Sequence, residues 1–413
     1  MSRTAQACRF CGAPLERVFV DLGSSPLANS YLEPEALDRA EPFYPLCVYV
    51  CERCWLAQLP AVATPEQIFG DYAYFSSYST SWLEHARRYC EAMIGRFDLG
   101  ASSQVVEVAS NDGYLLRHFV ARGVPVLGVE PAANVAAAAE AAGIPTEVRF
   151  FGRETAEDLA ARGFAADLLL GNNVLAHVPD LNDFVAGLAR LLKPAGVLTM
   201  EFPHLERLVA ENQFDTIYHE HFSYFSFVAV ERVFAAHGLA LFDVEELPTH
   251  GGSLRVYAQR ADGGTQPRAA AVEALLARER ASGVETAAWY EAFGERVRET
   301  KRKLLDFLIR EKRAGRTIVG YGAPAKGNTL LVYCGVRADF LDYTVDRSPH
   351  KQGRYLPGSR IPIHAPERIF ETRPDYVWIL PWNLRAEIAE QMAGIREWGG
   401  RFVVAVPEVQ VLP

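Results

Sequence analysis

Long apolar runs are absent from this 413-residue chain, and no stretch of about 18 consecutive apolar residues could span a bilayer. The N-terminus, Met1 to Cys8, also lacks the apolar core of a signal peptide. An excess of positive charge is absent too, because the formal net charge is −9. A net-negative surface attracts neither nucleic acid nor anionic membranes. We therefore expect a cytoplasmic protein with no nucleic-acid or membrane partner.

Disulfides are not expected in that compartment, so the seven cysteines need another explanation. Four of them form two Cys-x-x-Cys pairs about forty residues apart, namely Cys8, Cys11, Cys51 and Cys54. Two such knuckles can place four thiolates around one tetrahedral Zn²⁺. Because four thiolates fill the coordination shell, we predict a structural metal with no open position for catalysis. Cys47 is left out, because its three-residue gap to Cys51 gives the knuckle geometry less often.

Strands and helices alternate from Val105 to Phe202. The expected strands are 105–109, 124–129, 146–150, 166–170 and 197–202, and the expected helices between them are 114–121, 135–142, 154–162 and 181–192. A further helix is expected before them, at 81–94. Such alternation predicts an α/β fold with a doubly wound, Rossmann-like parallel sheet, and ligands at the carboxyl ends of its strands.

A glycine-rich dinucleotide turn, G-x-G-x-x-G, is missing after the first strand, where Ala-Ser-Asn-Asp-Gly stands instead. Without those glycines a pyrophosphate could not approach the backbone closely. Glu130 nevertheless ends the second strand roughly 20 residues after Glu107, the spacing that places a carboxylate on a ribose diol. A nucleoside without phosphates fits both observations, which favours S-adenosylmethionine. The alternative is an α/β sheet with incidental acids at its strand ends.

The expected contacts of that cofactor follow the strand ends. Asn111 to Gly113 would lie near its amino-acid portion, Glu130 on its ribose, and Asn172 on the substrate side. The residues predicted to bind it are Glu107, Ser110, Asn111, Asp112, Gly113, Glu130, Asn172, Asn173 and His177. For His177 a role in the pocket and a role in capping a helix stay equally open.

Acid/base groups gather in the stretch Phe214 to Tyr224, which holds two histidines, two acids and two tyrosines. It offers no clean apolar face at helical spacing, so we predict an irregular segment crossing a cleft. His221 is the natural base, because an imidazole titrates near neutrality, and Glu220 or a tyrosine could orient it. The alternative is a polar core network or solvated histidines on a loop.

The last hundred residues predict a second α/β unit after long helices at 269–312. A strand at 317–321 meets the turn Gly322 to Asn328, which opens a helix and can cradle phosphates through its amides. As an isolated motif this turn has low specificity. Polar loops at 345–353 and 381–383 follow further strands and should converge on the same crevice. Before the helices, Thr249 to Val256 forms a Gly-Gly-Ser turn that leads into a strand containing Arg255.

Three segments, 106–115, 172–180 and 218–225, together resemble the S-adenosylmethionine-dependent sugar C-methyltransferases, of the dTDP-deoxysugar C-3′-methyltransferase type with an N-terminal zinc-binding domain. The resemblance implies that His221 is the base, with Tyr218 and Glu220 beside it. A tyrosine from the Tyr72 region would complete the pocket, with Tyr74 and Tyr78 as rivals. It also implies that the C-terminal half holds the nucleotide diphosphate of the sugar. The substrate-binding residues predicted on this basis are Ala325, Lys326, Gly327, Asn328, Asp346, Lys351 and Arg255.

These observations predict three parts: a zinc-binding domain at 1–70, an S-adenosylmethionine-dependent methyltransferase domain at 71–265, and a helical linker with a nucleotide-sugar-binding domain at 266–413. The expected reaction methylates a carbon, C3 by preference, next to the ketone of a dTDP-4-keto-deoxysugar through an enolate. The alternatives are C5-methylation by the same mechanism, or a nicotinamide-dependent oxidoreductase or epimerase. The sequence leaves open whether the sugar carries a C3 amino group, the product configuration, the pathway's end product, and the oligomeric state, with a monomer as one option.

Overall fold

The computed structural model describes residues 6–64, 67–68 and 76–412, and the chain divides into two compact units. Unit 1 comprises Met1–Arg17, Val50–Leu205 and Phe222–Thr286, and unit 2 comprises Val18–Tyr49, Glu206–His221 and Ala287–Pro413. Each unit is thus assembled from three separate stretches of chain. The predicted domain boundaries after residues 70 and 265 divide the chain consecutively, and they stay a prediction.

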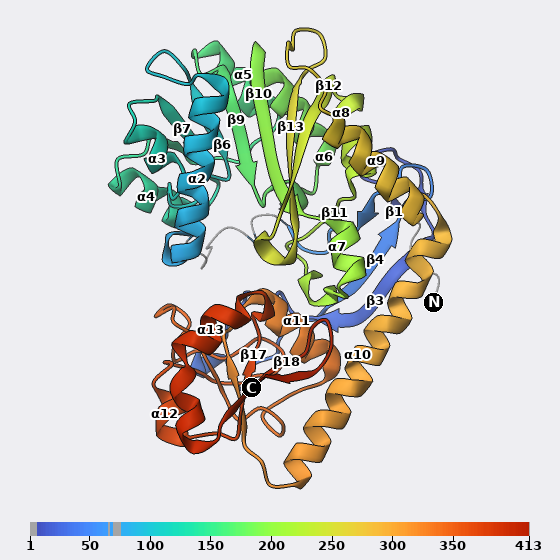
Figure 1. Cartoon of the computed structure of the whole chain (residues 1–413), viewed down its shortest axis with the longest axis vertical. Helices are drawn as coiled ribbons and strands as arrows, with labels where there is room; N and C mark the ends of the chain where they lie inside the picture. Colours follow the sequence, from blue (N-terminus) through green and yellow to red (C-terminus); the bar gives the residue numbers. More distant parts are fainter. Residues whose placement is uncertain (1–5, 65–66, 69–75, 413) are drawn as a thin grey trace. The chain divides into compact units, whose positions relative to one another are not determined.

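Unit 1 contains a seven-stranded sheet with the strand order β12-β13-β10-β9-β6-β7-β8 (Figure 1). Strands β6 to β10 pair in parallel, whereas β12 and β13 are antiparallel. The strands are β6 (Val105–Val108), β7 (Val126–Val129), β8 (Thr146–Glu147), β9 (Ala166–Asn172), β10 (Leu192–Pro203), β12 (Leu239–Leu247) and β13 (Ser253–Arg260). The strand order reverses between β6 and β9, and ligands of doubly wound sheets bind at such a point. The predicted fold class is confirmed.

The described helices of unit 1 are α2 (Thr80–Phe97), α3 (Leu116–Val120), α4 (Ala133–Ala141), α5 (Arg153–Ala161), α6 (Leu181–Leu191), α8 (Phe227–Ala236) and α9 (Ala270–Ser282). Four of them, α3 to α6, alternate with strands β6 to β10 as predicted; α2 precedes these strands, and α8 and α9 follow them in the chain. Helix α7 (Leu205–Ala210) follows β10 and belongs to unit 2 except for its first residue. All four residues of β6 are buried, as expected for a parallel strand covered on both faces. The core joins them to Phe119 of α3, Leu168 of β9 and Tyr257 of β13. Most bounds differ from the expected ones by a few residues. Strand β10 begins five residues earlier, at Leu192, and β8 ends three residues earlier, at Glu147. Strand β9 continues to Asn172, because that residue pairs with Glu201.

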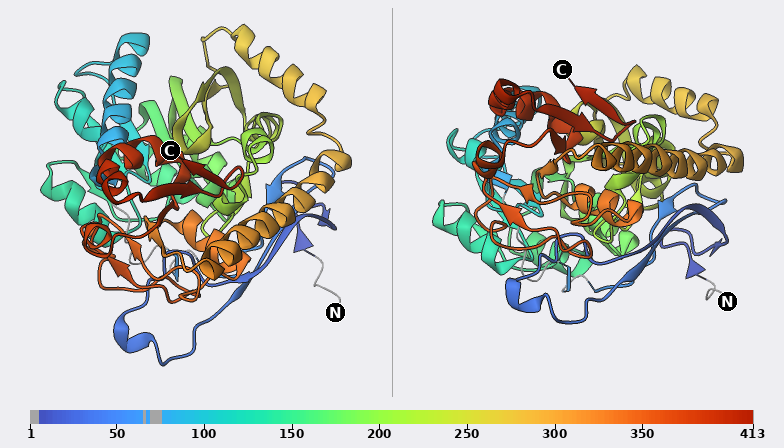
Figure 2. Two further views of the ribbon diagram at one scale, coloured as in Figure 1. Left: turned by 60° about the horizontal axis from the view of Figure 1, so that its bottom comes forward. Right: turned by 90° about the horizontal axis from the view of Figure 1, so that it is seen from below.

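Unit 2 contains a second sheet, of six strands, with the order β16-β15-β14-β17-β18-β19. The strands are β14 (Ile318–Tyr321), β15 (Thr344–Val345), β16 (Ile363–His364), β17 (Tyr376–Ile379), β18 (Arg401–Val404) and β19 (Gln410–Leu412). Its helices are α10 (Ala287–Arg313), α11 (Ala325–Cys334), α12 (Arg368–Thr372) and α13 (Arg385–Gln391), and Figure 2 shows them from two further directions. The strand order again has the doubly wound form, so its reversal lies between β14 and β17.

Helix α11 begins four residues earlier than the sequence indicated, at Ala325 rather than Thr329. Pro324 stands at its N-cap with an extended backbone, and its carbonyl accepts the amide of Asn328 at 3.1 Å. Proline is compatible with this position, because its fixed φ suits a helix start and its missing N–H costs nothing there. The predicted phosphate-binding turn therefore forms the first turn of a helix.

Short strands near the N-terminus complete both units. In unit 1, β1 (Gln6–Ala7) pairs with β2 (Pro14–Leu15), and β5 (Ala57–Gln58) pairs with β11 (Ser223–Tyr224). Strands β3 (Arg17–Ser25) and β4 (Tyr44–Val50) share a sheet and belong almost entirely to unit 2. The loop between them joins the C-terminal part of unit 2, since Leu32 bridges Tyr355 and Glu41 accepts the amide of Gly358 at 2.7 Å.

Among the described residues, the longest helices are too polar to lie across a bilayer, and none qualifies as a membrane span.

Candidate functional site

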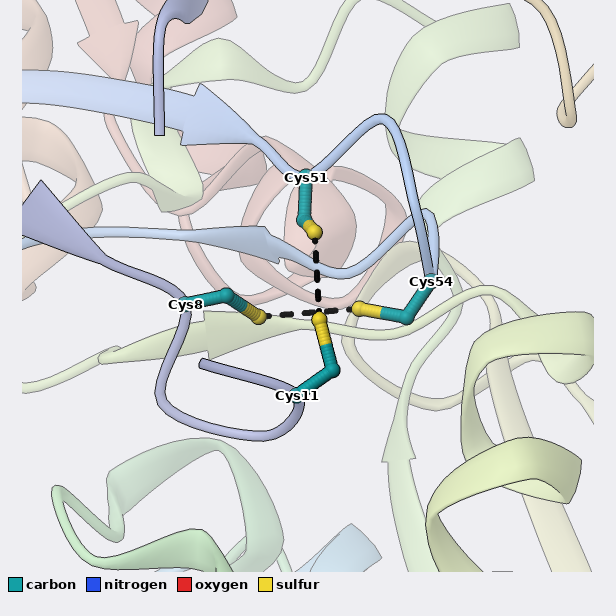
Figure 3. Close-up of side chains that lie close together, drawn as sticks. All are labelled: Cys8, Cys11, Cys51 and Cys54. Atoms are coloured by element: carbon teal, nitrogen blue, oxygen red, sulfur yellow. Dashed lines mark hydrogen bonds between the residues drawn. The ribbon is translucent and has the colours of Figure 1, made fainter. Parts of the chain in front are cut away.

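Four cysteines of unit 1 converge as their spacing predicted (Figure 3). Their ligand atoms all lie within 4.8 Å of one another, with Cys8 Sγ 3.6 Å from Cys54 Sγ and Cys11 Sγ 3.5 Å from Cys51 Sγ. Four sulfurs at about 2.3 Å from one zinc ion would lie about 3.8 Å apart, so the cluster fits that metal. Four thiolates complete a tetrahedral shell and leave no position for a reacting water. Zn²⁺ here is a structural cofactor.

Both cysteine pairs owe their shape to the same turn. The carbonyl of Cys8 accepts the amide of Gly12 at 2.9 Å, and that of Cys51 accepts the amide of Trp55 at 2.8 Å. Gly12 and Trp55 both have a positive φ, of 71° and 64°. Each turn therefore aims two thiols at the same point.

A first polar site of unit 1 lies where β6 and β7 end. Glu130 accepts the amide of Asn111 at 3.0 Å through Oε2 and the amide of Ala132 at 2.9 Å through Oε1. The Asn111 side chain accepts the amide of Ser76 at 2.9 Å, and Asp112 accepts the amide of Ser77 at 3.1 Å. The loop after β6 is thus fixed by backbone contacts on both sides. Each oxygen of Glu130 keeps a second lone pair that could accept a ligand's hydroxyl.

Three carboxyl groups, of Glu107, Asp112 and Glu130, lie at this edge of the sheet, and burial raises the pKa of two of them. Glu107 is completely buried, and burial together with the charges of Glu130 and Asp112 raises its pKa well above the usual range. Burial also raises the pKa of Glu130, although the two amides oppose the shift. Ser110 is buried in the same loop. Gly113 is needed here, because its φ is 72° and a Cβ would stand 2.8 Å from Ile144.

A second loop, after β9, brings three predicted residues to the same edge of the sheet. Asn172 donates to the Tyr114 hydroxyl at 3.4 Å, and the side chain of Asn173 lies 3.1 Å from His250 Nε2. Burial and the nearby charge of His250 lower the pKa of His177 to about 4, so this imidazole is neutral at physiological pH. The helix that follows, α6, is capped by the side chain of Asp180, so the capping role left open for His177 is filled by another residue.

Arg255, predicted to bind substrate, is buried in unit 1 between two acids. It donates to Glu201 at 2.8 Å and to Glu245 at 3.0 Å, and its guanidinium lies 4.7 Å from the Tyr89 ring centroid. Burial alone would raise the pKa of Glu201, but His85 and Arg255 lower it to about 2. These contacts give Arg255 a role in holding β10 and β13 together, and its role toward substrate stays a prediction.

The histidine-rich segment forms a turn within unit 2 rather than an extended stretch. The amide of His221 bonds the carbonyl of Tyr218 at 2.9 Å, after the 3₁₀ helix Phe214–Thr216. His221 Nδ1 lies 2.8 Å from the carbonyl of Thr216. A carbonyl only accepts, so Nδ1 carries the proton and Nε2 of the neutral ring carries the lone pair. The Tyr218 ring lies 4.1 Å from the His221 ring, centroid to centroid.

His219 lies two residues before His221 and is the other imidazole of this segment. Its Nε2 lies 3.2 Å from the carbonyl of Pro45, and its ring packs against Tyr44. Burial lowers the pKa of His219. The two histidines are therefore bound to different carbonyls on different segments, which the sequence spacing alone did not separate.

Glu220 belongs to a hydrogen-bonded network that reaches the C-terminal sheet of unit 2. Asn29 donates to Glu220 at 2.6 Å, and the Tyr31 hydroxyl lies 3.1 Å from the Asn29 oxygen and 2.6 Å from the carbonyl of Ala323. Lys351 donates to the same carbonyl at 2.9 Å. Asp346 accepts the amide of Ala323 at 2.8 Å. The predicted residues Glu220, Asp346 and Lys351 are thus joined through Asn29 and Tyr31.

The first turn of α11 carries the remaining predicted substrate residues: Ala325, Lys326, Gly327 and Asn328. Lys326 donates to Asn383 at 2.9 Å and lies 4.8 Å from the Trp382 ring centroid. Trp382 donates to Asp215 at 2.7 Å, and burial raises the pKa of Asp215 to about 6, although Lys326 opposes the shift. Both polar side-chain atoms of Asn328 are buried without a hydrogen-bond partner within the described part of the chain.

Gly327 serves packing, because a Cβ there would stand 2.9 Å from the side chain of Leu380. A bulky substitution at this position would therefore disturb the fold as well as any ligand.

Of the three candidate tyrosines, Tyr72 and Tyr74 lie outside the described residues. Tyr78 is described, in the 3₁₀ helix Ser76–Tyr78, and 58% of its surface is exposed. Four further residues of these contacts, Asn29, Tyr31, His85 and His250, have no signal in the sequence, because each lies far along the chain from its partner. Their contacts span between 77 and 292 positions, apart from the local pair Asn29 and Tyr31.

Comparisons with known proteins match three consecutive family models. Residues 8–69 match a zinc binding domain, residues 82–244 a methyltransferase domain, and residues 248–407 a C-methyltransferase C-terminal domain. The C-methyltransferase NovU of Streptomyces niveus is 40% identical over 413 aligned residues, which cover 99% of this chain and 97% of that protein. A ubiquinone biosynthesis O-methyltransferase of Rhizobium etli is 30% identical over 120 residues, 26% of this chain and 47% of that protein.

Proposed function

The chain belongs to the S-adenosylmethionine-dependent C-methyltransferases, and from this we propose that it methylates C3 of a dTDP-4-keto-deoxysugar, with His221 as the base. The observation that carries the proposal is the tautomer of His221, whose Nδ1 lies 2.8 Å from the Thr216 carbonyl and whose Nε2 therefore holds the lone pair. The comparisons assign methyl transfer to carbon, so the alternative of a nicotinamide-dependent enzyme is set aside. C5 of the same sugar class stays the second candidate position.

The chemistry needs a base because a C–H bond is a poor acid. An adjacent ketone makes it acidic enough, since the charge left behind spreads onto oxygen as an enolate. His221 Nε2 takes the proton, and Tyr218, whose ring lies 4.1 Å from the His221 ring, would support the imidazole or the enolate oxygen through its hydroxyl. Asn29 donates to Glu220 at 2.6 Å, and this hydrogen bond would orient the acid that precedes the base in the chain. A tyrosine from the Tyr72 region would complete the set.

S-adenosylmethionine supplies the methyl group, already activated by the positive charge on its sulfur. The residues that would hold it are those at the ends of β6, β7 and β9, with Glu130 on the ribose and Asn172 and Asn173 toward the substrate. His177, neutral because its pKa is about 4, can donate or accept a hydrogen bond in that pocket without adding a charge. No redox step is required, so binding and orientation supply much of the rate.

The nucleotide end of the substrate is assigned to unit 2. The first amides of a helix have no intrahelical partner, and the helix dipole favours an anion there, so the start of α11 suits a diphosphate. Lys326 and Lys351 add positive charge near this turn, and Asn328 offers an amide. Asp346, at the end of β15, stands where doubly wound sheets place the acid that binds a ribose.

The substrate is tested directly by incubating the purified protein with S-adenosylmethionine and a dTDP-4-keto-deoxysugar. We expect a product heavier by one methylene group, with the new methyl carbon bonded to C3 in its NMR spectrum. A methyl group on C5 would replace the proposed position by the second candidate. No methylated sugar with any 4-keto donor, alongside intact S-adenosylmethionine binding, would reject the substrate class.

Glu130→Gln is expected to weaken S-adenosylmethionine binding by about 1.5–3 kcal/mol, or roughly 10- to 150-fold in Kd, the range for hydrogen bonds to a charged group. An amide nitrogen cannot accept the two amides and the ribose hydroxyls that the carboxylate accepts. Isothermal titration calorimetry measures the loss, and dTDP binding should be unchanged. Glu140→Gln, on the exposed face of α4, is the matched control. Equal loss of both ligands would indicate a folding defect instead.

Lys326→Met is expected to reduce the heat protection that dTDP gives the protein. At 100 times its Kd a ligand stabilises by about 2.7 kcal/mol, and a tenfold weaker Kd lowers this by about 1.3 kcal/mol. Each variant is compared with its own ligand-free Tm, because the loss of Lys326 also leaves Asp215 without a nearby cation. Lys303→Met, exposed on α10, is the control. If dTDP raises the Tm of Lys326→Met as much as that of the wild type, the diphosphate binds elsewhere.

A further inference from the structure

Arg9 stands between two of the zinc-cluster cysteines, Cys8 and Cys11, at a place where metal binding does not require an arginine. The backbone of Arg9 is held by Gln58, because the Arg9 amide donates to Gln58 Oε1 at 2.9 Å. Gln58 also donates to the sulfur of Cys8 at 3.1 Å. The zinc cluster therefore holds the start of this side chain rigidly.

The guanidinium of Arg9 reaches two backbone carbonyls of unit 1. It donates to the carbonyl of Pro179 at 2.9 Å and to the carbonyl of Leu59, and it lies 5.5 Å from the centroid of the Phe222 ring. The knuckle is tied to the same region a second time, since Asn182 donates to the carbonyl of Arg9 at 3.2 Å. A guanidinium suits this place, because its fork of donors can serve two acceptors at once.

Both carbonyls belong to segments already linked to each other. The amide of Leu59 bonds the carbonyl of Phe222 at 2.9 Å, and the amide of Phe222 bonds the carbonyl of Ala176 at 2.7 Å. Ala176 lies three residues before Pro179 in the loop that follows β9. Arg9 thus closes a ring of contacts that runs through Leu59, Phe222 and the 176–179 loop.

Two members of this ring are next in the chain to residues proposed for the reaction. The loop carries His177, with Asn172 and Asn173 just before it, and Phe222 is the residue directly after His221 in the chain. A displacement of about 1 Å in groups that position a reaction can cost on the order of 10²-fold in rate. A side chain that fixes both the loop and Phe222 therefore bears on the position of all of them.

We propose that Arg9 is a positioning residue, through which the zinc cluster fixes the loop after β9 and the backbone at Phe222 for catalysis. The zinc cluster then does more than stabilise its own small turns. The inference rests on the proposed function for the roles of His221 and of the residues on the loop after β9. The loop and Phe222 can be followed without any substrate.

Two substitutions at Arg9 test this. Arg9→Met keeps the length and apolar stem of the side chain but removes both donors, and we expect kcat to fall about 10²-fold with zinc content and KM for S-adenosylmethionine close to wild type. Arg9→Lys keeps the charge but cannot bridge two carbonyls with a planar fork, so about a tenth of the wild-type kcat should return. Arg17→Met, whose exposed partner is Glu52 at 2.8 Å, is the control and should behave as wild type.

Amide hydrogen exchange, measured by mass spectrometry, reports on the loop and on Phe222 without any substrate. Arg9→Met should speed exchange in peptides covering 176–179 and 222, and should leave peptides from α4 unchanged. If zinc or Tm falls in parallel with kcat in both Arg9 variants, Arg9 only holds the fold together and the proposal is overturned. Wild-type kcat and exchange in Arg9→Met would overturn it as well. If the wild type fails to methylate the dTDP sugar, the proposed substrate fails, and the exchange result still decides the role of Arg9.

Discussion

His221→Asn is expected to lower the rate of methylation by about 10²- to 10⁴-fold, the usual cost of removing a general base. An asparagine can still donate from Nδ2 toward the carbonyl of Thr216, as Nδ1 of His221 does now at 2.8 Å. It offers no basic nitrogen in place of Nε2. The turn from Tyr218 should therefore keep its shape while the chemistry is lost, and both ligands should bind with wild-type affinity by calorimetry.

Proton removal can be followed apart from methyl transfer. In deuterated water without S-adenosylmethionine, the wild type should place deuterium on the sugar carbon if the first half-reaction occurs alone. His221→Asn should lose this exchange, and Tyr218→Phe should slow it. His219→Asn is the matched control two residues away, and since His219 bonds the carbonyl of Pro45, its loss should mainly affect stability. Exchange that survives in His221→Asn and vanishes in His219→Asn would transfer the role of base to His219.

Cys51→Ser is expected to remove zinc and most of the soluble yield. Structural zinc contributes about 10–16 kcal/mol of apparent binding free energy in small zinc domains, whereas a whole domain is stable by only about 5–15 kcal/mol. The four sulfurs lie within 4.8 Å of one another, so the loss of one leaves three thiolates that repel each other without the metal. Metal analysis and the yield of folded protein measure the effect.

Cys47→Ala provides the contrast for that experiment. Cys47 is buried on β4, four residues before Cys51, and lies outside the cluster. Its replacement should cost about 1 kcal/mol, as for an ordinary core change, and leave one zinc per chain. Full zinc occupancy and wild-type yield in Cys51→Ser would show that Cys51 is not a ligand.

Much of unit 1 was predictable, because its signals are local. Three of the four residues from Val105 to Val108 are valines, and Glu107 is the exception. Such an apolar run indicates a strand of a parallel sheet buried on both faces. The two Cys-x-x-Cys pairs carry their geometry in their spacing. Helix α11 begins earlier than predicted, because Pro324 itself stands at the N-cap and marks the start of the helix.

The contacts between distant segments were not predictable from one sequence. The chain between β3 and β4 lies between the two cysteine pairs in the sequence, yet it belongs to unit 2, where Tyr31 bonds Ala323 across 292 positions. Likewise, the sequence does not indicate that the His219 imidazole contacts the carbonyl of Pro45 while the His221 imidazole contacts the carbonyl of Thr216. Such pairings depend on tertiary packing, and a spacing of two residues is equally compatible with either histidine as the base.

The alternation of the chain between its two units has a consequence for biosynthesis. The polypeptide changes unit after residues 17, 49, 205, 221 and 286, so no single cut releases either unit intact. On the ribosome, β3 and β4 emerge long before Ala287–Pro413, the stretch that completes their unit. Their apolar surface, including Phe19, which packs on Tyr290 and Phe293, must wait for most of translation, which is the period when a nascent chain is most open to aggregation. A chaperone that shields the first fifty residues during synthesis would therefore raise the yield of folded protein more than one that acts after release.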